Sequence, residues 1–324
     1  MKSIIGKNLG NESNLKKFYG LLQTLGVFIF IVIIMSIFLP NFLTFSNITN
    51  LLRQLSVNLV VGAGMTFIIL TGEFDISVGS VLALTAVIAG TLIHLIGVWP
   101  ACIIALLIGP LFGLFNGVLV TKGKIPSFIC TLGTLMMARS LAFVITKGQV
   151  VSNFPESFKI LGQGSIAGFP NIFLIVIVVY LIGYIVLRKT TFGKKVYAVG
   201  SNKKVSMLSG INTDNIKIKS FMIVGFLTSL AAIMILSRLG AIQADTGKGL
   251  EFDTIAAVVI GGTSLYGGEG NILQTIIGVL IIGLIRNFLN LAHIDIFWQD
   301  FATGAIIVVA VLLDTLRKRV ALKI

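Results

Sequence analysis

Two acidic residues stand in a polar break of an apolar stretch and are the first candidates for chemistry. Glu73 and Asp75 lie in the segment 70–80, between two apolar runs. An ionised carboxylate at the edge of a membrane or inside it is costly, so it is usually hydrogen-bonded or functional. Asp75 has two compatible interpretations: it accepts amides at the start of a helix, or it lines a passage. We favour the structural role, with Ser77 or Ser80 capping that helix.

A second acidic break, rich in glycine, occupies residues 261–271. It is not a nucleotide-binding loop because the chain contains no GxxxxGK[ST] motif. We therefore expect no ATP hydrolysis by this chain and no cofactor. Matching breaks in two halves of a chain suggest an internal repeat with a transport route at its interface. We predict that the breaks face each other and gate this route through these side chains: Phe74, Asp75, Ser77, Ser80, Ser264 and Tyr266.

The largest polar segment between apolar runs, 188–219, is strongly basic and contains a short predicted helix. The pattern of 198–211 predicts one helix of about eight residues, roughly 12 Å long. Ser201 or Asn202 can cap its start, and Gly210 can take the left-handed position after its last turn. A helix this short is unstable alone in water, so it needs a partner surface.

Two kinds of surface can hold this helix. Lys203 and Lys204 would fix it against anionic lipid. Alternatively, Val205 and Leu208, three residues apart on one face, would enter a cleft of another protein. The residues assigned to that docking role are Gly200, Ser201, Asn202, Val205, Leu208, Ser209 and Gly210.

The histidines and cysteines predict neither a metal site nor a disulfide. His94 and His293 are the only histidines and lie far apart in the sequence. Cys102 and Cys130 stand in apolar stretches, and we interpret them as buried small hydrophobic residues.

Three glycines recur every four residues in one apolar segment and indicate close helix packing. We expect this packing within one subunit, in preference to a dimer seam. The glycines are Gly109, Gly113 and Gly117.

The composition requires membrane-spanning elements to position these residues. Of 324 residues, 56% are apolar and 11% charged, and the mean hydropathy is +1.02. Soluble chains carry about 25% charged residues, so a soluble enzyme, a disordered regulator and a disulfide-rich secreted domain are excluded. We predict an all-α polytopic membrane protein of about ten transmembrane helices, some short or broken. The apolar segments are 21–39, 55–71, 78–98, 100–121, 125–146, 168–187, 218–240, 253–266, 272–291 and 298–316.

The distribution of charge predicts the topology. With both termini cytoplasmic, most of the 25 basic residues fall in cytoplasmic segments. The predicted organisation is a cytoplasmic tail (1–20), a transmembrane permease domain (21–316) with the cytoplasmic loop 188–219, and a cytoplasmic tail (317–324). The outer loops 147–167 and 240–254 are either solvated connections or a docking surface for an extracytoplasmic partner.

Several motifs together resemble the ribose-type sugar permeases of bacterial ABC importers. The run Thr71-Gly-Glu-Phe-Asp-Ile-Ser-Val-Gly-Ser80 is similar to the family pattern Gly-Gly-Ile-Asp-Leu-Ser-Val-Gly-Ser. Ala198-Val-Gly-Ser-Asn202 with Leu208-Ser-Gly-Ile211 resembles the cytoplasmic coupling segment of that family, and 259–270 resembles a third signature. The resemblance covers roughly 25–318. Glu73 and Phe74 depart from the usual Gly and Ile, and Lys203 to Val205 replace a more acidic pattern.

The resemblance implies a non-enzymatic permease subunit in the bacterial inner membrane that carries a monosaccharide, ribose first. Its partners would be a cytoplasmic ABC ATPase, a second permease subunit, either an identical copy or a different chain, and an extracytoplasmic sugar-binding protein. No nucleic acid is expected. Xylose, galactose, autoinducer-2 or a nucleoside are alternative substrates. An ion-coupled secondary transporter is the alternative class, although no carboxylate is expected in the middle of a helix.

Overall fold

The computed structural model describes residues 24–39 and 41–321, and most of these are helical. The predicted tail 1–20 lies outside the described residues. The helices are Thr24–Phe38, α2 (Phe45–Leu70), α3 (Val78–Ile96), α4 (Val98–Thr121), α5 (Ser127–Thr146), α6 (Glu156–Gln163), α7 (Asn171–Lys189), α8 (Thr191–Ser201), α9 (Lys203–Leu208), α10 (Thr213–Leu239), α11 (Leu250–Ile260), α12 (Ile272–Leu291) and α13 (Ile296–Ala321). The predicted all-α class is confirmed.

Four two-residue strands form two small antiparallel pairs in the described part of the chain. They are β1 (Val151–Ser152), β2 (Ser165–Ile166), β3 (Phe169–Pro170) and β4 (Ala241–Ile242). β1 pairs with β4, and β2 pairs with β3.

Seven helices of the described chain are long and apolar enough to cross a membrane, which makes this a multi-pass membrane protein. They are α2, α3, α4, α5, α7, α10 and α12, and each matches one predicted apolar segment. The other three predicted segments correspond to Thr24–Phe38, α11 and α13. The count of ten crossings and the cytoplasmic termini stay predictions.

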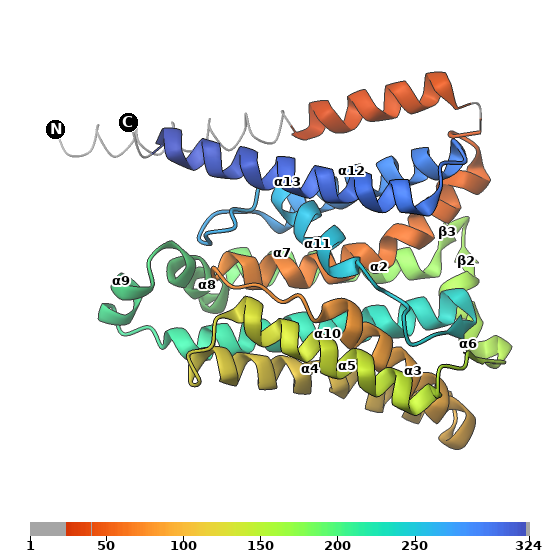
Figure 1. Cartoon of the computed structure of the whole chain (residues 1–324), viewed down its shortest axis with the longest axis horizontal. Coiled ribbons are helices and arrows are strands. Elements are labelled where there is room, and N and C mark those ends of the chain that lie inside the picture. The colour runs from red at the N-terminus through yellow and green to blue at the C-terminus, as the bar shows by residue number, and fades with distance from the viewer. Residues whose placement is uncertain (1–23, 40, 322–324) are drawn as a thin grey trace.

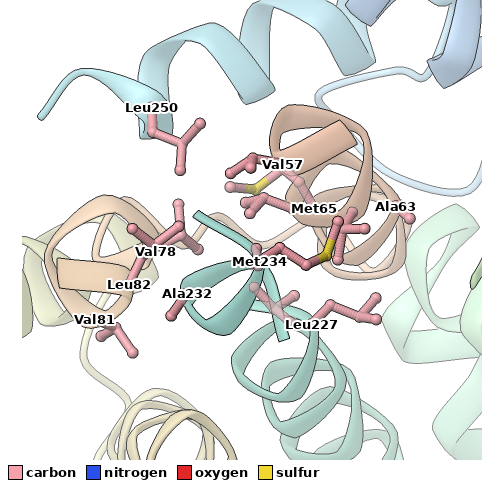
Figure 2. Close-up of a cluster of buried hydrophobic side chains, with 14 of the residues drawn as sticks. Val57, Ala63, Met65, Val78, Val81, Leu82, Leu227, Ala232, Met234 and Leu250 are labelled. Atoms are coloured by element: carbon pink, nitrogen blue, oxygen red, sulfur yellow. The ribbon is translucent and has the colours of Figure 1, made fainter. Parts of the chain in front are cut away.

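Helix α10 lies at the centre of the bundle and packs against α2, α3 and α4. Figure 2 shows buried side chains of α2, α3 and α10, together with Leu250 of α11, gathered in one apolar cluster. The glycines of α4 allow its close approach to α10: a Cβ atom at Gly109 would lie 1.9 Å from the carbonyl oxygen of Gly225, and one at Gly113 would lie 2.3 Å from that of Phe221. The prediction of packing within one subunit is confirmed.

Two helices begin inside the bundle instead of at its ends. After α2, the chain runs through 71–77 toward the middle of the bundle, where α3 begins (Figure 1). From the other side, the chain turns back after α10 and passes through 243–249 before α11 begins (Figure 1). α11 has 11 residues, about 16 Å, or half a bilayer. The prediction of short or broken helices is confirmed, whereas the internal repeat stays a prediction.

The two ends of the bundle differ in content. We call the end that carries α8 and α9 the basic end, and the last residues of α13 also lie there (Figure 1). Lys124 of the loop 122–126 and Lys203 of α9 line the same cavity at this end. The opposite end carries α6 and the β2–β3 pair (Figure 1).

The outer loops 147–167 and 240–254 are not simple connections, because β1 and β4 join them. Glu251 and Asp253, expected in the outer loop 240–254, instead form the first turn of α11 and are 4% and 5% exposed. Arg286 of α12 forms an ion pair with Asp253 at 2.8 Å, which compensates for the burial of that carboxylate.

Candidate coupling and gating site

Asp75 is buried just before α3 and belongs to a chain of hydrogen bonds. Its Oδ1 accepts the backbone N–H of Ser77 at 2.9 Å and the Ser77 hydroxyl at 2.5 Å. The Ser77 Oγ accepts from the Asn116 amide at 3.2 Å, and the Thr134 hydroxyl donates to Asn116 Oδ1 at 2.5 Å. The predicted hydrogen bond from a backbone N–H group to the Asp75 carboxylate is therefore present.

The predicted capping of α3 by a serine side chain is wrong. Ser77 occupies the N-cap position, but its side chain makes no capping bond because it donates to Asp75. Ser80 lies in the first turn of α3, is fully buried, and its hydroxyl has no partner among the described residues.

The extended segment before α3 is held by hydroxyl groups of α5. The N–H of Phe74 donates to Ser127 Oγ at 3.3 Å, and the N–H of Ile76 donates to Thr131 Oγ1 at 3.2 Å. Backbone that is neither helix nor sheet is tolerated at membrane depth only when such partners satisfy it.

The two breaks meet at the basic end. The N–H of Gly268 donates to the carbonyl oxygen of Leu70 at 2.9 Å. Gly72 and Gly267 both have positive φ, and a Cβ atom on Gly267 would lie 2.7 Å from the Gly72 nitrogen. Only glycine permits this contact without strain. The breaks do face each other, while their role as a gate stays a prediction.

The end of α8 lies against this junction. A Cβ atom at Gly200 would lie 1.8 Å from the carbonyl oxygen of Leu70 and 2.4 Å from the Gly268 nitrogen. The Tyr197 hydroxyl donates to the carbonyl of Gly270 at 3.0 Å. Burial raises the pKa of Tyr197, so its hydroxyl keeps its proton for this bond.

The segment 198–211 forms two helices, so the prediction of one helix is wrong. Residues up to Ser201 belong to α8, whose own start is capped by Thr190 through a bond from the Gly193 N–H. Asn202 then breaks the helix with an extended backbone and caps α9 by accepting the Val205 N–H at 3.0 Å.

Gly210 ends α9 as predicted. Its φ is +78°, its N–H donates to the Met207 carbonyl, and the Ile211 N–H donates to the Ser206 carbonyl. These two bonds form a Schellman motif, which satisfies the last carbonyls of the helix.

The apolar side chains of α9 project away from the protein. Val205 is 56% exposed, Met207 is 55% exposed and Leu208 is 89% exposed. Beside them a cavity of about 760 Å³ opens between α9 and the loop that precedes α5. Its lining includes Lys124, Lys203 and Asp214. A six-residue helix with its apolar side chains exposed requires a partner.

An ion pair links the first break to the helix that follows α9. Lys217 of α10 contacts the carboxylate of Glu73, and both side chains are largely buried. Glu73 also lines the cavity beside α9. This pair ties the start of α10 to the break that precedes Asp75.

The predicted passage residues differ in their access to the surface of this chain. Asp75, Ser77, Ser80 and Ser264 are buried, Phe74 is half-buried, and Tyr266 is 57% exposed. The predicted docking residues are all exposed except Gly200, which is half-buried at the junction. Both functional assignments stay predictions.

Three residues of this site lacked a role in the sequence analysis. Asn116 is a polar residue in an apolar helix, and that alone could have marked it. Tyr197 and Lys217 carried no such signal, because their partners, Gly270 and Glu73, are distant in the sequence.

Comparison with known proteins identifies the family. Residues 47–311 match the family described as branched-chain amino acid transport system, permease component. The chain belongs to this family of permease components. Its members are transport subunits, which agrees with the expectation of a non-enzymatic chain.

Individual relatives of this permease share about two fifths of their residues with it. The chain is 42% identical to the ribose import permease protein RbsC of Haemophilus influenzae, over 88% of this chain and 90% of the relative. It is 41% identical to RbsC of Bacillus subtilis, over 95% and 98%. It is 36% identical to the L-arabinose transport system permease protein AraH of Escherichia coli, over 93% and 91%. No solved structure matches the chain.

Proposed function

We propose that this permease is the membrane subunit of a bacterial ABC importer for a pentose, with ribose as the first candidate. The relatives named ribose import permease cover nearly the whole chain and support this substrate. The relatives named for arabinose make that sugar the alternative. The expected location is the inner membrane.

The observation that carries the proposal is α9, a capped helix of six residues with Val205, Met207 and Leu208 exposed. This helix would enter a cleft of a separate ATPase, which supplies the energy that the chain cannot obtain from ATP itself. The cap at Asn202 and the Schellman motif at Gly210 fix its direction, so that the apolar side chains are presented before the partner binds.

The helices on either side of α9 connect it to the two breaks. α8 precedes α9 and rests with Gly200 on the Leu70–Gly268 junction. α10 follows α9 and holds Glu73 through Lys217. A displacement imposed by the ATPase would therefore reach both breaks through backbone contact and through a buried ion pair.

Two further partners complete the proposal. An extracytoplasmic binding protein would dock at the opposite end and supply affinity and specificity for the sugar. A second permease subunit would pair with this chain. A passage must release its substrate, so we expect no micromolar binding of ribose or arabinose by the purified chain alone in a calorimetric titration. Such binding would favour an ion-coupled transporter.

Copurification tests the docking of the ATPase. Tagged chain is purified from membranes of its host, and untagged ABC ATPase is detected by mass spectrometry. Leu208→Asp and Gly210→Val should lose the ATPase by at least tenfold. Ile160→Asp places the same charge on an exposed residue of α6 and should retain it. Equal recovery from Leu208→Asp and the unsubstituted chain would contradict the proposal.

A further inference from the structure

Polar side chains project from the segment that precedes α11. This segment, 243–249, connects β4 to α11, and the side chains of Gln243, Asp245 and Lys248 are exposed. Its backbone is folded by short turns: the N–H of Thr246 donates to the Gln243 carbonyl and the N–H of Lys248 donates to the Asp245 carbonyl, both at 3.1 Å.

Arg139 of α5 fixes this segment in place. Its Nη1 donates to the carbonyl oxygen of Ala244 at 2.7 Å and to that of Thr246 at 3.0 Å. Asp245 and Glu251 both interact electrostatically with the guanidinium. An arginine within a spanning helix is costly, and its pairing with backbone carbonyls indicates a specific role.

The depth of Arg139 places this surface inside the membrane. It lies two turns before the end of α5 at Thr146, about 10 Å along the helix axis. The 20 residues of α5 extend about 30 Å, the thickness of the hydrocarbon core. Taking the two ends of α5 as the boundaries of this core, we infer that Arg139 and the carbonyls that it binds lie within it. Exposed amide, carboxylate and ammonium groups at that depth cannot face lipid, and they require a water-filled passage.

The inner side of the segment is closed against α3. A Cβ atom at Gly79 would lie 2.4 Å from the carbonyl oxygen of Gly247 and 2.1 Å from Glu251 Oε2. Glu251 is 4% exposed, and its Oε1 accepts the Gly249 N–H at 3.3 Å. The side chains of 243–248 can therefore meet a solute only on the side away from α3.

We propose that Gln243, Asp245 and Lys248, held in position by Arg139, form a sugar-contacting wall of the passage. The positive charges of Arg139 and Lys248 balance the carboxylates of Asp245 and Glu251, which suits a neutral polyhydroxy solute better than an ion. The three side chains offer both donors and acceptors to its hydroxyl groups. The identity of the solute rests on the proposed function. The exposure of these three side chains to water in the passage, which we call the wet surface, does not.

Thiol labelling tests the wet surface. In a chain with Cys102→Ala and Cys130→Ala, single cysteines replace Gln243 or Lys248 and are treated in intact cells with a charged, membrane-impermeant maleimide. Leu107→Cys is the matched control, because Leu107 is 59% exposed on α4 and lies at a similar depth. We expect at least tenfold faster labelling at 243 and 248 than at 107. Equally slow labelling at all three positions would overturn the proposal.

Transport kinetics test the contact with sugar. Because the binding protein sets the affinity for the sugar, Asp245→Asn and Gln243→Leu should lower the maximal rate of ribose uptake at least fivefold, with little change in KM and unchanged copurification of the ATPase. Fast labelling with an unchanged maximal rate in both variants would overturn the assignment of a sugar contact. If the unsubstituted chain carries no pentose, the proposed function fails. Fast labelling at 243 and 248 would still support a passage wall, and slow labelling there would still overturn the passage wall.

Discussion

The backbone N–H of Gly268 donates a 2.9 Å hydrogen bond to the carbonyl oxygen of Leu70, and this bond joins two breaks that lie almost two hundred residues apart in the chain. Gly200, at the end of α8, lies in contact with both partners of the bond. The three segments singled out in the sequence thus form one junction. Its distinctive property is backbone contact without intervening side chains, which transmits small displacements.

Gly200→Ala should disturb this junction. The added Cβ would lie 1.8 Å from the Leu70 oxygen, so the backbone must move at a cost of about 1–3 kcal/mol. We expect a lower melting temperature in detergent and at least a tenfold loss of ATP-driven uptake. Gly133→Ala is the control, because nothing lies within 4 Å of a Cβ there. Equal behaviour of the two variants would contradict the role of the junction.

The Glu73–Lys217 pair should stabilise the protein only when its two side chains carry opposite charges. Glu73→Lys or Lys217→Glu alone leaves two like charges in largely buried positions, and we expect a destabilisation of about 3 kcal/mol with loss of uptake. The exchanged double variant should recover at least half of the lost stability. Thermal unfolding of the four chains measures this coupling, and additive losses in the double variant would exclude an interaction between the two residues.

Asp75 is expected to be structural, and its two substitutions should differ. Asp75→Asn keeps an oxygen that accepts both bonds from Ser77, so its effect on stability should be small. Asp75→Ala leaves the N–H and hydroxyl of Ser77 without that acceptor and should cost about 1–3 kcal/mol. Melting temperatures of the two variants in detergent provide the comparison, and a more severe effect of Asp75→Asn would contradict this role.

The sequence predicted the helices and the glycine contacts well because both depend on local pattern. The positions of Gly109 and Gly113 on one face of α4, and of Gly210 after α9, follow from spacing alone. The division between α8 and α9 was missed because Asn202, expected to start one helix, also ends another.

The interior polar contacts could not be predicted in the same way. Glu251 and Asp253 follow a glycine-containing polar stretch that is typical of a solvated loop. Their burial depends on the return of 243–249 into the bundle and on Arg139 and Arg286 from other helices. Such contacts between distant segments leave no trace in local hydropathy.

Impermeant thiol labelling also checks the topology. In the cysteine-free chain, Ser157→Cys at the opposite end should react in intact cells, whereas Ser209→Cys beside α9 should react only after lysis. Both residues are exposed, whereas Ser206 is 4% exposed and is unsuitable as a reporter. Labelling of Ser209→Cys in intact cells would contradict the prediction that α9 lies on the cytoplasmic side of the membrane.

ATP-driven uptake of sugar tests the central claim most directly. The permease, the ATPase that copurifies with it and the matching binding protein are reconstituted in liposomes, and uptake of labelled ribose and arabinose is measured with and without ATP. We predict ATP-dependent uptake of a pentose, ribose in preference, that falls at least tenfold in Leu208→Asp. Uptake that is independent of ATP, or unchanged in Leu208→Asp, would contradict the account.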